Sequence, residues 1–141
     1  MKVNDNMKLD SQLCFPLYAA ARKIVNLYTP LLKPLGLTYT QYIMFLVLWE
    51  EEKITVGDLC KRLKLDTGTV TPMLKNTEKQ GLINRTRSEE DERVVVVSLT
   101  EEGKALYKKA KDIPTKLSSC VRLSRDEAVQ LYTTLYKLLK E

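Results

Sequence analysis

Two short amphipathic segments joined by a tight connection constrain the fold of this chain more than any other feature. Residues 55–63 and residues 67–80 each place apolar side chains on one helical face, and Gly81 ends the second segment. The residues between them, 64–66, leave room only for a turn. The pattern therefore predicts a helix-turn-helix unit.

A β-hairpin is predicted directly after this unit. Residues 82–87 and 93–99 have the composition of strands, the second being rich in valine, and the polar turn at 88–92 joins them. A helix-turn-helix followed by a hairpin is a winged-helix arrangement. The expected fold class is therefore mainly α with a small β-hairpin.

Helical patterns flank this region on both sides. Thr38 and Gln41 form a capping-box pattern that opens an apolar helix at 39–50. The last helix carries an apolar stripe suited to packing against the N-terminal helix and a second chain. This stripe consists of Ala128, Leu131, Tyr132, Leu135, Leu138 and Leu139. We expect a single domain (1–141) with dimerisation helices at 10–36 and 101–141 and a winged-helix DNA-binding region at 38–100.

Composition excludes several classes of function. Histidine is absent, which excludes Ser-His-Asp and Cys-His catalysis and histidine-ligated zinc. The three cysteines, Cys14, Cys60 and Cys120, are too widely spaced for a CxxC clip, so we expect no cofactor and no metal. No apolar run approaches the roughly 18 to 20 residues needed to cross a bilayer, and residues 1–10 lack a secretion signal. We expect a cytoplasmic protein without a membrane partner.

The positive charge of the chain is concentrated in one stretch. Residues 53–87 contain eight basic and three acidic residues, which accounts for the whole net charge of +5. A concentrated basic segment indicates a polyanionic partner, and its overlap with the helix-turn-helix favours double-stranded DNA.

The start of the second helix of this unit is the predicted DNA-reading surface. Small hydroxyl side chains at a helix N-terminus allow close approach to phosphates and base edges. The candidate residues are Thr67, Gly68, Thr69, Thr71, Pro72 and Lys75. Because proline disfavours a helix interior, we expect regular helical geometry to begin near Thr69. The alternative is an ordinary capped helix with solvated threonines.

Arginines in the hairpin extend this predicted surface. Arg93 lies just past the turn, where a wing can insert it into a minor groove, and Arg85 and Arg87 share a strand face suited to backbone contacts. Asp91 is expected to pair with Arg93 and orient it. The alternative is that this ion pair lies on a solvated hairpin and has no role in DNA binding.

Cys14 is the candidate for chemistry. It lies near the start of the first helix, where unsatisfied amides and the helix dipole favour a thiolate. Tyr18 and Tyr28 share its helical face and can donate hydrogen bonds to sulfur. The alternative is an inert core cysteine, which is also the interpretation we favour for Cys60.

Four blocks in order, residues 13–18 (LCFPLY), 36–42 (GLTYTQY), 65–75 (LDTGTVTPMLK) and 91–100 (DERVVVVSLT), resemble the MarR family, and within it the organic hydroperoxide resistance repressors. The resemblance covers about residues 13–109. It implies a homodimeric winged helix that represses a gene until an organic hydroperoxide oxidises a cysteine near the N-terminus.

The resemblance also implies roles for particular residues. The sensing cysteine falls on Cys14, and the tyrosines that support its thiolate fall on Tyr18, Tyr28 and Tyr39. Some members have a second, resolving cysteine near the C-terminal helices, a position that Cys120 approximates. Pro16 departs from the small residue common at that position in the family.

We therefore expect a non-enzymatic, homodimeric repressor that binds a pseudo-palindromic operator and releases it when an organic hydroperoxide oxidises Cys14. Two alternatives stay open. One is a repressor gated by a small aromatic ligand in the dimer cleft, and the other is a thiol peroxidase. The absence of histidine and of an evident activating base near Cys14 argues against the peroxidase.

Overall fold

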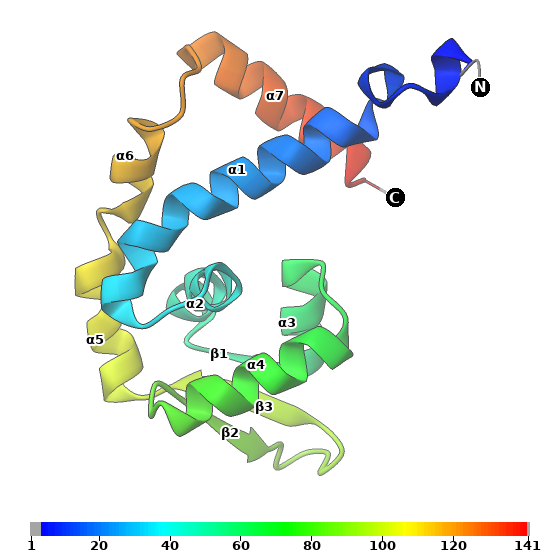
Figure 1. Cartoon of the computed structure of the whole chain (residues 1–141). Coiled ribbons are helices and arrows are strands. Elements are labelled where there is room, and N and C mark those ends of the chain that lie inside the picture. The colour runs from blue at the N-terminus through cyan, green and yellow to red at the C-terminus, as the bar shows by residue number, and fades with distance from the viewer. Residues whose placement is uncertain (1–3, 141) are drawn as a thin grey trace.

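The structure, a computed structural model, describes residues 4–140 of the chain; residues 1–3 and 141 of the predicted domain lie outside the described residues. Figure 1 shows a lower winged-helix part, from α2 to β3, and an upper part in which α1, α6 and α7 extend beyond it. In chain order the elements are η1 (Asp5–Met7), η2 (Leu9–Ser11), α1 (Cys14–Leu32), η3 (Lys33–Leu35), α2 (Tyr39–Glu51), β1 (Lys53–Thr55), α3 (Val56–Leu63), α4 (Thr67–Lys79), β2 (Ile83–Arg87), β3 (Val95–Leu99), α5 (Glu101–Ala110), α6 (Ile113–Ser118) and α7 (Arg125–Leu138).

The expected fold class is confirmed, with one strand more than the sequence predicts. β2 and β3 form the predicted antiparallel hairpin, and β1 pairs with the other edge of β3, with Ile54 opposite Val97. β1 has three residues, too few for an alternating pattern to identify it as a strand. The second hairpin strand begins at Val95, so Arg93 lies in the connecting loop rather than in the strand.

The core lies between α2 and the helix-turn-helix. The α2 side chains of Met44, Phe45 and Leu48 are fully buried and pack in one cluster with Leu59 of α3 and Val70 of α4. Burial of such side chains contributes roughly 1.5 to 3 kcal/mol each. The core therefore fixes α3 and α4 relative to the sheet, and the outward faces of α4 and the hairpin are held in place by it.

Side-chain caps define where the helices begin. The Thr38–Gln41 capping box is present as predicted, with Gln41 N–H donating to Thr38 Oγ1 at 3.2 Å and Thr38 N–H to Gln41 Oε1 at 2.9 Å. The expectation that regular geometry begins near Thr69 is wrong, because α4 starts at Thr67 with Pro72 inside it. The N-cap is Asp66, which accepts the Thr69 N–H at 2.8 Å and so fixes the first turn ahead of the proline.

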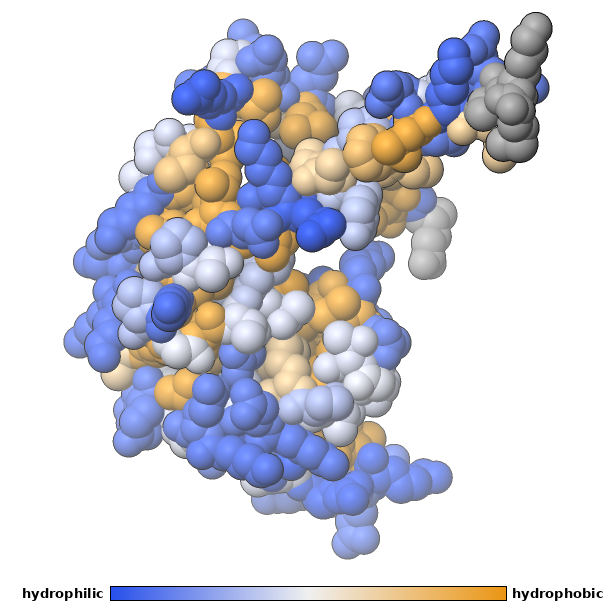
Figure 2. Space-filling view, viewed as in Figure 1, coloured by the Kyte–Doolittle hydropathy of each residue, from blue (hydrophilic) through white to orange (hydrophobic). Residues whose placement is uncertain are grey.

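The upper part leaves apolar side chains exposed within the protomer. No residue of α7 is buried, and Leu131, Tyr132 and Leu138 of the predicted stripe are exposed. Figure 2 shows hydrophobic side chains gathered over this upper part and hydrophilic ones along the lower edge. In the described residues no single helix could cross a membrane; only α1 with η3 and α2 together, bent by 73°, have the length and composition.

Candidate nucleic-acid interface and thiol site

The first turns of α4 present hydroxyl groups to solvent. Val70, Leu74 and Thr77 are buried against the core, which turns Thr67 and Thr69 outward and leaves both exposed. Besides its backbone contact, Asp66 accepts the Thr69 hydroxyl at 3.0 Å, and these hydrogen bonds from Thr69 lower the pKa of Asp66. The cap therefore stays ionised at neutral pH and holds the helix start rigid.

The remaining predicted residues of this helix lie on the same surface. Thr71 is half-buried at the edge of the outward face, whereas Gly68, Pro72 and Lys75 are exposed. Lys75 makes no salt bridge within residues 4–140. Its ammonium group is therefore available to a phosphate.

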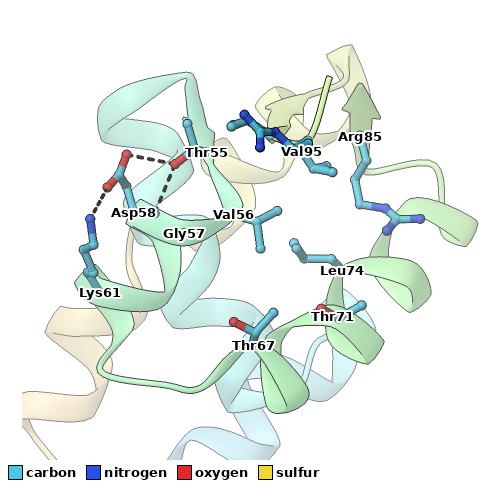
Figure 3. Close-up of a pocket in the computed structure, with 12 residues that line it drawn as sticks. Thr55, Val56, Gly57, Asp58, Lys61, Thr67, Thr71, Leu74, Arg85 and Val95 are labelled. Atoms are coloured by element: carbon cyan, nitrogen blue, oxygen red, sulfur yellow. Dashed lines mark hydrogen bonds and ion pairs between the residues drawn. The ribbon is translucent and has the colours of Figure 1, made fainter. Parts of the chain in front are cut away.

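A groove of about 460 Å³ lies between α3, α4 and the hairpin. Figure 3 shows Thr67, Thr71 and Leu74 of α4 pointing toward Val56, at the start of α3. The remaining lining residues are Thr55, Gly57, Asp58, Lys61, Arg85, Arg93, Val94 and Val95. In a winged helix, the helix that contacts base edges, here α4 and called the reading helix, and the adjacent wing can contact neighbouring grooves of one duplex.

The three hairpin arginines differ in their surroundings. The Arg93 side chain is 90% exposed and contacts Asp91, with Nε donating to Oδ1 at 3.1 Å. Hydrogen bonds from the backbone and side chain of Arg93 lower the pKa of Asp91. Arg87 is exposed and donates to the Glu92 carbonyl at 2.9 Å. Arg85 is half-buried and paired with Glu78, a partner that sequence reasoning did not identify.

A buried polar contact between α2 and α4 also escaped the sequence analysis. Gln41 Nε2 donates to Thr77 Oγ1 at 2.9 Å and to Gln80 Oε1 at 3.0 Å, and both Gln41 and Thr77 are buried. The polar character of both residues is visible in the sequence, but their pairing across 36 positions is not. This contact ties the start of α2 to the reading helix.

The thiol of Cys14 is exposed at the first position of α1. No side chain caps this helix end, because the N-cap residue is Leu13. Tyr18, one turn further, is exposed and stacks with Arg22, whose guanidinium carbon lies 5.5 Å from the ring centroid. In the protomer, Cys14 is therefore accessible from solvent.

The predicted supporting tyrosines form a cluster of their own. The ring centroid of Tyr28 lies 4.8 Å from that of Tyr39 and 5.5 Å from that of Tyr42. Burial and the two neighbouring tyrosines raise the pKa of Tyr28 to about 12, and burial raises the pKa of Tyr39. Both hydroxyls therefore stay protonated at physiological pH and can donate to an anion.

This cluster does not contact Cys14 of the same chain. Cys14 and Tyr28 both lie on α1, and at a rise of 1.5 Å per residue they are about 21 Å apart along the helix axis. Only Tyr18, at the i+4 position, lies close to the thiol. Cys14 and Tyr28 share one helical face, as the sequence predicts, but their spacing of 14 residues in one continuous helix keeps them apart.

The other two cysteines lie in different environments. Cys60 is buried between α3 and α4, as expected, with its sulfur 3.9 Å from the Thr67 hydroxyl. Cys120 is exposed in the segment between α6 and α7, and its thiol donates to the Lys116 carbonyl at 3.4 Å. Figure 1 shows this segment at the opposite side of the protomer from the N-terminal end of α1. No metal-binding cluster occurs within residues 4–140.

An exposed hydroxyl-bearing helix beside a groove and a wing, on this fold, defines a winged-helix transcriptional regulator. The chain belongs to the MarR-type transcriptional regulators, and its residues 26–110 match the family described as transcriptional regulator SarA/Rot. It is 52% identical to the organic hydroperoxide resistance transcriptional regulator of Bacillus subtilis (strain 168) over 136 residues, which are 96% of this chain and 92% of that protein.

Solved structures of AbfR from Staphylococcus epidermidis are also similar to this chain. Reduced AbfR bound to DNA matches with a TM-score of 0.76 at 33% identity, covering 98% of this chain and 100% of AbfR. Disulfide-formed AbfR matches with a TM-score of 0.66 at 34% identity, covering 96% of each chain. These relatives are transcriptional regulators and not enzymes, which sets the thiol peroxidase alternative aside.

Proposed function

We propose that the chain is a homodimeric repressor that binds a pseudo-palindromic DNA operator and releases it when an organic hydroperoxide oxidises Cys14. The observation that carries the DNA-binding part is the exposed start of α4, which lines one groove together with Arg93 of the wing loop. Thr67 and Thr69 enter the major groove, and Arg93 enters the adjacent minor groove, where Asp91 holds its guanidinium. The relatives support this assignment, since reduced AbfR is DNA-bound in its structure.

A second copy of the chain covers the exposed apolar faces of the upper part. Leu13 just before α1, Leu17 of α1, and Tyr136 and Leu138 of α7 are exposed in the protomer, which a lone protein rarely tolerates over a contiguous surface. We assign the predicted dimerisation segments, 10–36 and 101–141, to this interface. Two-fold symmetry then presents two α4 helices to successive turns of the duplex.

The dimer also explains how tyrosines reach the sensing thiol. The Tyr28–Tyr39 pair lies too far from Cys14 in its own chain, and both hydroxyls remain protonated donors. In the dimer, the cluster of one protomer receives Cys14 of its partner, and two O–H donors stabilise the thiolate. This pairing requires α1 helices that cross near their ends.

Oxidation then proceeds in two balanced steps. The Cys14 thiolate attacks one peroxide oxygen, the O–O bond breaks, and the alcohol leaves after taking a proton; sulfur loses two electrons and becomes a sulfenic acid. The thiol of Cys120 in the partner protomer then attacks this sulfur, and water leaves as the disulfide forms. A disulfide requires Cα atoms within about 7 Å, so the upper helices move when it forms. This movement changes the positions of the two α4 helices relative to each other.

The DNA contacts predict two distinguishable mutant phenotypes. Arg93→Ala is expected to weaken operator binding by about 1 to 3 kcal/mol, because one groove-inserted arginine is lost. Lys75→Ala is expected to weaken binding to all sequences alike and to reduce the salt slope by about one, as the loss of one phosphate contact requires. Titrations of a labelled duplex at several salt concentrations measure both. Wild-type affinity in a folded, dimeric Arg93→Ala protein would contradict the wing assignment.

A second candidate function has a structural observation in its favour. A cavity of about 410 Å³ next to Tyr39 is lined by Val25, Leu37 and Lys33, among others. Its size suits a small molecule, and the lysine suits a carboxylate. A repressor gated by an aromatic acid would bind DNA equally well before and after treatment with cumene hydroperoxide, whereas the thiol sensor would not.

A further inference from the structure

Arg85 and Glu78 form the most extensive side-chain ion pair between elements of the winged helix. Arg85 Nε and Nη2 donate to Glu78 Oε2 at 3.0 and 2.7 Å, and the Arg85 backbone N–H donates to Oε1 at 3.1 Å. Both carboxylate oxygens are thereby occupied. The Arg85 side chain is only 25% exposed, whereas that of Arg93 is 90% exposed.

The position of this pair in the fold is informative. Glu78 lies in the last turn of the reading helix α4, and Arg85 lies in the middle of β2, the first strand of the wing. The chain connects the two elements through Gly81, whose φ of 73° sharply reverses its direction. On the other side of the turn, Thr100 Oγ1 donates to the Gly81 carbonyl at 2.7 Å. The pair therefore adds a bracing contact on the solvent side of this junction, in addition to Ile83 of β2, which is buried in the same core cluster as Val70 and Leu74 of α4.

We propose that Arg85 is a positioning residue: clamped by Glu78, it fixes the angle between the reading helix and the wing, and it does not contact DNA. Figure 3 shows its side chain directed away from Thr67 and Val56, the residues that face each other across the groove. This proposal rests on the proposed function, because the angle matters only if α4 and the wing enter neighbouring grooves of one duplex. It assigns the sequence-predicted contact at Arg85 to an intramolecular role.

The two possible roles of Arg85 predict opposite effects of neutralising Glu78. If Arg85 contacts a phosphate, Glu78→Gln frees the guanidinium and removes a repelling charge, so DNA binding tightens. If Arg85 is a clamp, Glu78→Gln loosens the wing and DNA binding weakens. Glu89→Gln is the matched control, since it removes a negative charge from an exposed loop position that makes no ion pair within residues 4–140.

The experiment uses the full-length dimer and a duplex selected from a random-sequence pool by the wild-type protein. Glu78→Gln and Arg85→Gln are each expected to weaken binding about 3- to 10-fold, as loss of a charge-assisted bracing contact requires. The double variant is expected to be no weaker than either single variant, because both remove the same contact. The salt slope stays at its wild-type value in all three, and Glu89→Gln binds at least as tightly as wild type.

Arg85→Lys provides a second arm that does not depend on removing a charge. One ammonium group cannot reproduce the bonds of the guanidinium to Glu78, so the clamp predicts weakened binding; a phosphate contact predicts nearly wild-type affinity. Unchanged or tighter binding by Glu78→Gln, a salt slope reduced by about one in Arg85→Gln, or wild-type affinity of Arg85→Lys overturns the proposal. If the wild-type protein selects no duplex, the proposed function itself fails, and this result is distinct from all the others.

Discussion

Cys14→Ser is expected to bind operator DNA with wild-type affinity and to lose its response to organic hydroperoxide completely. Serine is close to cysteine in size, and position 14 lies outside the core of the protomer, so we expect neither the fold nor the position of α4 to change. A hydroxyl group is not oxidised by a peroxide, and the first step of the switch is therefore removed. In the wild type, an allosteric coupling of ordinary size corresponds to a loss of affinity of about 5- to 150-fold.

A matched cysteine variant shows whether the effect belongs to this position. Cys60 is buried in the core of the helix-turn-helix, and Cys60→Ala is expected to respond to hydroperoxide as the wild type does. The measurement is the affinity for one labelled duplex before and after treatment of each protein with cumene hydroperoxide. If Cys14→Ser still released DNA on treatment while Cys60→Ala did not, the sensing thiol would be Cys60 and the assignment would be wrong.

Oxidised wild-type protein is expected to run as a covalent dimer on non-reducing gels, and Cys120→Ser is expected to abolish this species entirely. Cys120 is exposed beyond α6, and Cys14 begins α1 at the other side of the same protomer, so we expect the disulfide to join two chains. A structure of AbfR, a relative of this chain, also contains a disulfide. The same gel detects the loss of the species in Cys14→Ser.

The fate of Cys14 in the Cys120→Ser protein provides the control for this prediction. Without a resolving thiol, the sulfenic acid at Cys14 persists and reacts with dimedone, which mass spectrometry of the Cys14 peptide detects. A wild-type protein that loses DNA affinity yet stays monomeric on non-reducing gels would show that one cysteine is sufficient. Cys120 would then have no part in the switch.

Sequence reasoning predicts the elements of the winged helix well because their determinants are local. Helix periodicity, the cap at Thr38 and the stop at Gly81 each depend on residues within one or two turns, and all three are present in the structure. The two hairpin strands follow from valine content and a polar turn in the same way. The apolar stripe of α7 is also visible in the sequence, although nothing in a single protomer covers it.

The features that sequence reasoning missed depend on distant pairings. β1 is recognisable only through its partner strand, because Ile54 pairs with Val97. The Arg85–Glu78 clamp and the buried Gln41–Thr77 contact join residues on different elements, and their side chains have no pattern that identifies the partner. Pro72 suggests that α4 begins later than it does. The Asp66 cap stabilises the first turn strongly enough for the helix to begin ahead of the proline.

The separation of Cys14 from the tyrosine cluster has the largest consequence for function. Shared helical phase suggests that Cys14 and Tyr28 cooperate, but they lie about 21 Å apart along the helix axis. We therefore place the sensing site between two chains, with the dimer as part of it. The same conclusion holds for Cys14 and Cys120.

The central claim, that oxidation of Cys14 controls DNA binding, is tested most directly by one titration. The reduced dimer, the same sample after one equivalent of cumene hydroperoxide per protomer, and that sample after dithiothreitol are each titrated against one selected duplex. We predict an affinity loss of about 5- to 150-fold on oxidation and full recovery on reduction. Unchanged affinity in a sample whose Cys14 is shown by mass spectrometry to be oxidised would contradict the claim.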